Sequence, residues 1–364
     1  MSGAGWKERL RAVPVQTRFL AALNAALVLI AAACALSLWW MGNSFETITA
    51  ADRFRGGGET RFAQLACCMS VGQGKTEEDI RKLRSDLESK FVEQSLEAPE
   101  GGSLYIDAYS ARTLVSAVTE HATAEVSAIA VGGEFFYFHP LTLRSGSYIA
   151  ERDLMDDLVV LDEAMAWRLF GGTELAGMPL TINGKPFVVS GVVSLEDDFA
   201  SRQARSGDGL IFLSYSALAR LGIESAIDCY EIVMPDPISG YAMGIAEEMM
   251  SGADIVENSG RFTPERLLAL LQSFGQRSMR TGAVIYPYWE NALRLAEDHG
   301  ALLMVLAVLT ALCPVITLAV LLIGAVRSLW RFLLREVPRR IETSVERRRE
   351  KQYAKLAAKD REGE

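Results

Sequence analysis

The residues that could support chemistry are few and lie far apart in the sequence. Gly72-Gln73-Gly74-Lys75-Thr76 matches the end of a phosphate-binding P-loop, in which backbone N–H groups and a lysine hold nucleotide phosphates. That motif also requires a glycine five residues before Gly74, where this chain has Met69. We therefore expect a loop that begins a helix, and no nucleotide site.

Three of the 5 cysteines, Cys67, Cys68 and Cys229, lie outside the apolar segments of the chain. Cys67 and Cys68 are neighbours in a predicted strand, so their side chains point to opposite faces. An external compartment permits a disulfide from either residue to Cys229, and the sequence leaves open whether one forms. No second Cys or His pair has the spacing of metal ligands, so we expect no metal site.

Histidines and clustered acids are the remaining candidates for catalysis or cation binding. No histidine lies near a Ser or Cys in a nucleophile context, and the acidic clusters do not match a calcium-binding loop. We expect no catalytic, cofactor-binding or metal-ligating residue, and hence no enzyme. The residues weighed are His121, His139, His299, Asp153, Asp156, Asp157, Glu196, Asp197 and Asp198.

Two uncharged apolar segments bracket the chain, Phe19 to Met41 and Ala301 to Val326. The first would be about 34 Å long as a helix, enough to cross a hydrocarbon core of roughly 30 Å. A cleaved signal peptide is the alternative for this segment. Its length and the bulky residues Trp39 and Trp40 favour an uncleaved membrane helix, with aromatic rings at the interface.

Charge is distributed unevenly along the chain. The net charge is +3 over residues 1–18, +5 over 327–364 and −17 over the remainder. Basic flanks stay on the cytoplasmic side, which predicts both termini inside and residues 42–300 outside the inner membrane of a bacterium. The acidic external part would repel phosphates, so nucleic acid is not an expected partner.

Small residues recur along the first membrane helix at Ala22, Ala26, Ala33 and Ser37. This spacing permits close approach of another helix, and therefore homo- or hetero-oligomers within the bilayer. The alternative is an alanine-rich lipid anchor. Neither membrane segment contains an ionisable side chain other than cysteine, so this pair alone is not expected to conduct or pump ions.

The external part alternates strands and helices around a hairpin-rich centre. Asn183-Gly184 between two apolar strands predicts a type I′ hairpin, because both turn residues then have positive φ. A strand at Leu158 to Leu161 followed by a helix at Glu163 to Phe170 precedes it. A further helix, beginning at Pro287, should run unbroken into the second membrane segment.

The sequence therefore predicts a membrane-anchored α+β protein, with two transmembrane helices flanking a two-lobed extracytoplasmic domain of mixed α/β structure. The expected divisions are a cytoplasmic N-terminus (1–18), transmembrane helices (19–41 and 301–326), the extracytoplasmic domain (42–300) and a basic cytoplasmic tail (327–364). Within the domain we expect a membrane-proximal lobe at about 60–135 and 225–285, and an inserted distal lobe at about 136–224.

The segment from residue 134 to 193 resembles the periplasmic core domain of MacB-type ABC transporter permeases, in the wider FtsX-like class. The resemblance rests on the order and spacing of short motifs. These are Leu143-Arg144-Ser145-Gly146-Ser147-Tyr148-Ile149, Val159-Val160-Leu161-Asp162-Glu163, Leu169-Phe170-Gly171, Gly177-Met178-Pro179-Leu180-Thr181-Ile182 and Phe187-Val188-Val189-Ser190-Gly191-Val192-Val193.

This resemblance implies a permease-like or accessory subunit whose external domain docks substrate or partner proteins. It also implies an ABC ATPase and other permease subunits as partners. MacB-like permeases have three membrane helices after the domain, whereas this chain has one apolar segment there and no ATP-binding domain. The alternative is a free-standing, membrane-anchored module that binds or senses an extracytoplasmic ligand.

Overall fold

The computed structural model describes residues 14–58, 60–96, 98, 102–153, 155–205, 207, 209–273, 280–281 and 284–361. The chain forms two compact units, one of residues 1–36 with 305–364 and the other of residues 37–304. We call them the helical unit and the mixed unit. Two long helices, α2 (Val15–Ser44) and α11 (Tyr288–Arg361), have residues in both.

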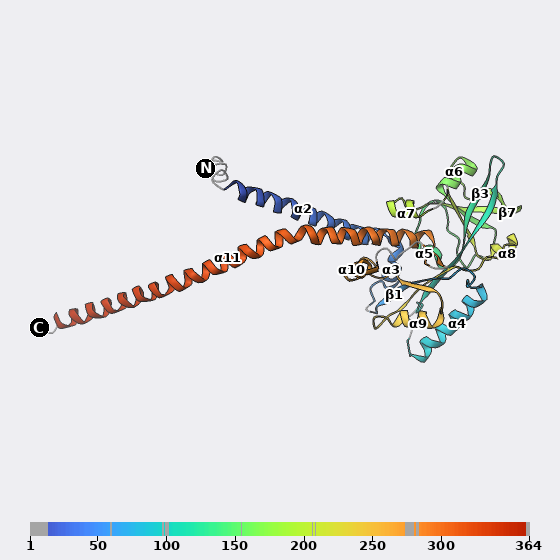
Figure 1. Ribbon diagram of the computed structural model, residues 1–364. Helices are drawn as coiled ribbons and strands as arrows, with labels where there is room; N and C mark the ends of the chain where they lie inside the picture. The colour runs from blue at the N-terminus through green and yellow to red at the C-terminus, as the bar shows by residue number, and fades with distance from the viewer. Residues whose placement is uncertain are drawn as a thin grey trace. The chain divides into compact units, whose positions relative to one another are not determined.

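The helical unit consists of parts of α2 and α11, the two helices long and apolar enough to cross a membrane (Figure 1). Most of its large apolar side chains are exposed, as expected for contact with lipid. One polar contact joins the helices, since Thr317 Oγ1 donates to Asn24 Oδ1 at 3.4 Å. The two predicted membrane helices are confirmed, and both extend beyond their predicted bounds.

Among the described residues, the mixed unit is built on a ten-stranded sheet of order β10-β1-β9-β2-β3-β8-β5-β7-β4, with β6 paired to β2 and β7. Neighbouring strands are antiparallel except in the parallel pairs β3–β8 and β5–β7. The strands are β1 (Phe62–Cys68), β2 (Ile106–Val118), β3 (Thr123–Gly133), β4 (Thr142–Gly146), β5 (Leu158–Asp162), β6 (Pro179–Ile182), β7 (Lys185–Ser194), β8 (Leu210–Ser214), β9 (Cys229–Pro235) and β10 (Asp254–Glu257). A separate two-stranded pair joins β11 (Arg280–Thr281) to β12 (Val284–Ile285).

Short helices cover both faces of the β10-β1-β9 end of the sheet. Helices α4 and α9 lie side by side on one face, where they enclose a core around Leu65 and Tyr230 (Figure 1). The opposite face packs against α3, α5 and the beginning of α11, in a core around Phe135 and Trp289. The helices are η1 (Glu46–Ile48), α3 (Ala50–Arg55), α4 (Glu77–Glu93), α5 (Phe135–Phe138), α6 (Glu163–Phe170), α7 (Phe199–Ala204), α8 (Ala217–Leu221), α9 (Tyr241–Met249) and α10 (Pro264–Ser273).

At the other end of the sheet, six strands close into a ring through the pairings β2–β3, β3–β8, β8–β5, β5–β7, β7–β6 and β6–β2. A third core fills this ring, with Val159, Phe187 and Ile211 inside it and Met165 of α6 among its residues. Closing a sheet in this way removes unpaired strand edges.

Asn183, in the predicted hairpin, closes the ring through hydrogen bonds between the β6–β7 turn and β2. Its φ is 45° and that of Gly184 is 78°, as a type I′ turn requires, so this prediction is confirmed. The Asn183 backbone N–H donates to Ser116 O at 2.9 Å, and Asn183 Oδ1 accepts from Ser116 N at 2.8 Å. The turn thus satisfies both backbone polar groups of one β2 residue.

The predicted strand at Leu158 to Leu161 is present as β5, which ends one residue later at Asp162. The helix α6 has its predicted bounds, and α11 begins one residue after Pro287 and continues unbroken through 301–326. The long strands β2 and β3 contribute to the cores at both ends of the sheet. The division into a proximal and a distal lobe therefore stays a proposal.

Candidate functional site: a buried charge cluster at the start of α11

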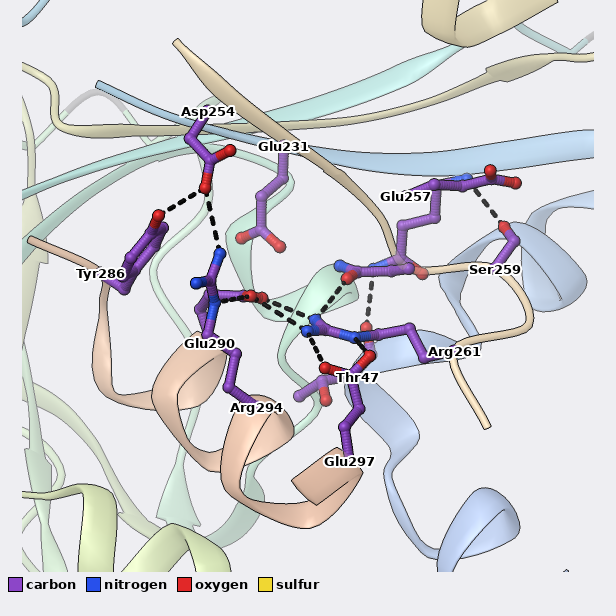
Figure 2. A network of polar contacts seen from close by, with 12 residues as sticks. Thr47, Glu231, Asp254, Glu257, Ser259, Arg261, Tyr286, Glu290, Arg294 and Glu297 are labelled. Carbon is purple, nitrogen blue, oxygen red and sulfur yellow. Dashed lines mark hydrogen bonds and ion pairs between the residues drawn. The ribbon is translucent and has the colours of Figure 1, made fainter. Parts of the chain in front are cut away.

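Arg261 is the centre of a buried charge cluster formed with side chains of α11. It lies in the turn between β10 and α10 and is 1% exposed. All five N–H groups of its guanidinium are used (Figure 2). Two go to Glu290 at 2.6 and 3.0 Å, two to Glu297 at 2.8 and 3.1 Å, and one to Asn258 Oδ1 at 2.9 Å.

A second arginine extends the cluster toward β10. Arg294 donates from Nε to Glu290 at 2.8 Å and from Nη2 to Asp254 at 3.0 Å. Its guanidinium also lies 3.6 Å from the centre of the Tyr286 ring, a cation–π contact, and the Tyr286 hydroxyl donates to the same Asp254 carboxylate. Figure 2 shows these groups converging from the start of α11 and from β10.

Electrostatics keep Glu290 and Arg261 ionised despite their burial. Burial by itself raises the pKa of Glu290, but the charges of Arg261 and Arg294 outweigh it and hold that pKa below its ordinary value. Burial lowers the pKa of Arg261, and Glu290 and Glu297 more than offset this, so the pKa is raised. The three acidic and two arginine side chains have a formal net charge of −1, and Asp254, whose side chain is 41% exposed, lies at the solvent end of the cluster.

Gln64 connects this cluster to the segment that follows α2. The side chain of Gln64, in β1, is fully buried; its Nε2 donates to Thr47 O at 2.6 Å and its Oε1 accepts from Ala50 N at 3.0 Å. Its backbone carbonyl accepts from Asn258 N at 2.7 Å, and Asn258 holds Arg261. A chain of hydrogen bonds thus runs from α11 through Arg261, Asn258 and Gln64 to α3.

This cluster of hydrogen-bonded charges fixes the position of the start of α11 against the sheet. Removing one partner would leave an uncompensated charge in the core, so the cluster favours a single geometry between α11 and the sheet. The geometry holds no nucleophile beside a base.

The P-loop-like segment proves to be a helix start, as expected. Lys75 bridges to Ile227 by backbone hydrogen bonds, and Thr76 is the N-cap of α4. Thr76 Oγ1 accepts from Asp79 N, and the Asp79 carboxylate accepts from Thr76 N at 2.8 Å, which completes a capping box.

Two of the three external cysteines, Cys68 and Cys229, lie opposite each other in the sheet, and Cys67 does not join them. Cys68 lies directly opposite Cys229 on neighbouring strands, whereas Cys67 lies opposite Tyr230 and belongs to the core on the other face of the sheet. All three are buried and are free thiols in this structure.

The histidines and acidic clusters have structural partners. His139 is buried, with Nε2 at 2.5 Å from Glu231 and its ring against Phe135 and Trp289. His299 Nδ1 contacts Leu295 O, and His121 is exposed. The clustered acids that have partners bind nearby backbone or arginine groups, with Asp153 on Ala150 N, Asp156 and Asp157 on Arg220, Glu196 on Tyr288, Asp197 on Arg202 and Asp198 on Ser201 N.

A hollow of about 650 Å³ lies beside the start of α11. Aromatic and cationic groups line it, and three buried atoms among its lining residues have no hydrogen-bond partner in the described part of the chain. These atoms are Arg205 Nη1, Trp289 Nε1 and Asn291 Oδ1, with Arg205 Nη1 also 4.0 Å from Glu196.

Comparison with known proteins decides the family. A family model described as the MacB-like periplasmic core domain matches residues 25–240. The chain belongs to the MacB-like periplasmic core domain family. A search of curated proteins finds no match. MacB-like periplasmic core domains occur in ABC-type transporter permeases, which are not typical enzymes. With its two apolar helices, this MacB-like chain is a membrane protein with an extracytoplasmic domain.

Three solved structures are among those to which this MacB-like chain is similar. The extracellular domain of the noncanonic ABC-type transporter YknZ from Gram-positive bacteria is 15% identical, with 52% of this chain and 90% of that chain covered and a TM-score of 0.36. The periplasmic region of MacB from Actinobacillus actinomycetemcomitans is 18% identical, with 63% and 99% covered and a TM-score of 0.40. A domain of a proposed permease from Porphyromonas gingivalis is 15% identical, with 57% and 96% covered and a TM-score of 0.32.

Sequence reasoning did not find the charge cluster. Glu290, Arg294 and Glu297 share one face of the predicted helix, since they are four and seven residues apart, and this pattern was a usable signal. Nothing in the sequence indicates that Arg261, 29 residues before Glu290, is their partner. The family match covers residues 25–240 and so does not reach the cluster.

Proposed function

We propose that this chain is a permease-like or accessory subunit of an ABC transport system. Its extracytoplasmic domain docks substrate or partner proteins and is moved by a separate cytoplasmic ATPase. One observation carries the proposal: α11 contains both the buried cluster residues and the uncharged segment 301–326 in one unbroken helix. Family membership supplies the transporter context.

The mechanism follows from the stiffness of this connection. An α-helix transmits displacement along its axis, and the five hydrogen bonds to Arg261 anchor α11 to the β10–α10 turn. Movement of the membrane segment would therefore be delivered to β10 and, through Asn258 and Gln64, to β1.

The proposal places the chain in a bacterial inner membrane with residues 1–18 and 327–364 in the cytoplasm. Other permease subunits would supply the membrane helices that are absent from the described residues. The exposed apolar faces of the helical unit, with small residues at Ala22, Ala26 and Ala33, would contact lipid and those subunits.

Purification from native membranes tests the assembly. The full chain, solubilised in a mild detergent, is expected to retain an ABC ATPase in a fixed ratio, identified by mass spectrometry and by ATP hydrolysis. Recovery of the folded chain without an ATPase or another permease subunit would contradict the proposal.

Glu297→Gln then tests the coupling. The amide keeps an acceptor for Arg261 but removes one charge, so the complex should still assemble while substrate-dependent ATP hydrolysis falls severalfold. Asp197→Asn, which alters an exposed ion pair with Arg202, is the matched control and should leave hydrolysis unchanged. Equal activity in both variants would exclude the cluster from coupling.

A second candidate is a free-standing module that binds an extracytoplasmic ligand. The 650 Å³ hollow favours it, because Arg112, Arg205 and three aromatic residues are among those that line it. Aromatic and arginine side chains suit an amphipathic carboxylate.

Decanoate titrated into the full chain in nanodiscs, followed by tryptophan fluorescence, would test this candidate. Binding that Arg205→Ala abolishes and Arg202→Ala retains would support it. Absence of saturable binding to the unmodified chain would remove it.

A further inference from the structure

Cys68 and Cys229 occupy the kind of position in which two strands can be cross-linked. They lie directly opposite each other on the antiparallel strands β1 and β9. The Met69 N–H donates to Asp228 O at 2.8 Å, so the hydrogen-bonded positions of this ladder include residue 69. Because hydrogen-bonded and non-hydrogen-bonded pairs alternate, the Cys68–Cys229 pair is of the non-hydrogen-bonded type.

In non-hydrogen-bonded pairs the two Cα atoms lie closer together than in hydrogen-bonded pairs. They are typically about 4.5 Å apart with the side chains close together, within the range of roughly 4.4–6.8 Å that disulfides span. Both side chains belong to the same core cluster, on the face that packs against α3 and the start of α11. Cys68 is 0% and Cys229 1% exposed, so an unbonded pair here would be two thiols packed against each other.

We propose that Cys68 and Cys229 form a cross-strand disulfide in the mature protein, with Cys67 left as a free thiol. The inference rests on the extracytoplasmic location of the domain and on strand register, and it is independent of the transport role. Disulfides form and persist in that compartment.

The bond forms by two exchange steps with a disulfide oxidant, either a thiol oxidoreductase or oxidised glutathione. One cysteine thiolate attacks the oxidant disulfide and releases the first oxidant thiol. The other cysteine thiolate then attacks the mixed disulfide and releases the second. Two thiols lose two electrons and two protons, and the oxidant disulfide is reduced to two thiols.

Oxidation must precede closure of the sheet. In the folded domain the hydrogen bond with Cys68 and burial raise the pKa of the Cys229 thiol, so little nucleophilic thiolate is present. The bond is therefore made during folding and is afterwards shielded from reductants. It would hold together two central strands that are 161 positions apart in sequence.

Cys67 is the competing thiol, and the register of the strands excludes it. It points to the opposite face, into the core that contains Tyr230 and Leu65. Joining it to Cys229 would require a one-residue slip, which transfers every β1 side chain to the wrong face.

Thiol mapping on the full chain tests the proposal. The protein is produced in a Gram-negative host, free thiols are blocked with N-ethylmaleimide in intact cells and again after denaturation, and peptides are analysed by mass spectrometry. We expect three of the 5 cysteines, Cys34, Cys67 and Cys313, to be alkylated without reduction, and all 5 after reduction. A linked peptide pair joining Cys68 to Cys229 should be found.

Cys67→Ala is the matched control, because it changes the neighbouring buried cysteine and should leave the linked pair intact. Alkylation of all 5 thiols without reduction, or a link through Cys67, would overturn the proposal. The decisive measurement uses the unmodified chain, so it does not depend on a variant that folds.

Discussion

A single arginine joins α11 to the turn between β10 and α10. Arg261 donates all five N–H groups to Glu290, Glu297 and Asn258, an arrangement that the planar fork of arginine permits and the point charge of lysine does not. Both glutamates are buried, and Arg261 is a charged partner of each. Arg261 thus acts by fixing the position of α11 relative to the β10–α10 turn.

Arg261→Ala should destabilise the mixed unit by about 3–5 kcal/mol, since it removes from a buried site the guanidinium that Glu290 and Glu297 share, and Arg294 pairs only with Glu290 of these two. Thermal or urea unfolding of the full chain, followed by tryptophan fluorescence, measures this. Arg202→Ala removes an ion pair whose side chains are 57% and 85% exposed, and should change stability by less than about 0.5 kcal/mol. Equal effects of the two substitutions would refute the assignment.

Asp162 makes the stability of the mixed unit depend on pH. It caps α6 through Met165 N, and burial raises its pKa to about 6 from a model-peptide value of 3.8. The folded state therefore binds this proton more tightly than the unfolded chain between about pH 4 and 6. Stability from this group is present below pH 4 and is lost as the pH rises through about 6.

Asp162→Asn should remove that dependence, because asparagine does not titrate and still caps a helix. The difference in unfolding free energy between variant and parent should shift in favour of the variant by on the order of 2 kcal/mol between pH 4 and 7.5. Urea unfolding at the two pH values measures it. A constant difference would show that Asp162 does not titrate in this range.

At the scale of elements, one turn decides whether the ring of strands is closed. Asn183 contributes a positive φ to the hairpin between β6 and β7, and it also pairs with both backbone groups of Ser116 on β2. The turn chemistry is local, whereas the pairing with β2 joins segments 67 residues apart.

Asn183→Gly should cost about 1 kcal/mol, because glycine keeps the turn conformation but loses the acceptor for Ser116 N. Asn183→Asp retains an oxygen at the same place and should remain near the parent in stability. Unfolding midpoints of the three chains provide the comparison. If both variants are equally destabilised, the side-chain bond to β2 is not the cause.

For the whole molecule, the distribution of charge predicts which side of the membrane each part of the chain lies on. Single cysteines introduced as His121→Cys, at the exposed β2–β3 turn, and Arg347→Cys, in the exposed tail, report on it. A membrane-impermeant maleimide applied to spheroplasts should label position 121 at once and position 347 only after permeabilisation. The reverse pattern, or labelling of both, would contradict the proposed topology.

Much of the fold follows from local signals in the sequence. Uncharged length predicts the two membrane helices, a short apolar run predicts the strand at Leu158 to Leu161, and Asn183-Gly184 between apolar strands predicts the hairpin turn. Spaced motifs between residues 143 and 193 were sufficient to indicate the family. These features depend on neighbours in sequence, for which backbone preferences and burial patterns are informative.

Only the tertiary structure decided which distant groups meet. Glu290 and Glu297 are visible as one helical face, but their pairing with Arg261 depends on how β10 and α10 return to α11. The two cysteines of the central sheet likewise become partners only through the β1–β9 register, and Cys67 is excluded by one residue. Such pairings are set by the summed packing of a whole sheet, which no short stretch of sequence encodes.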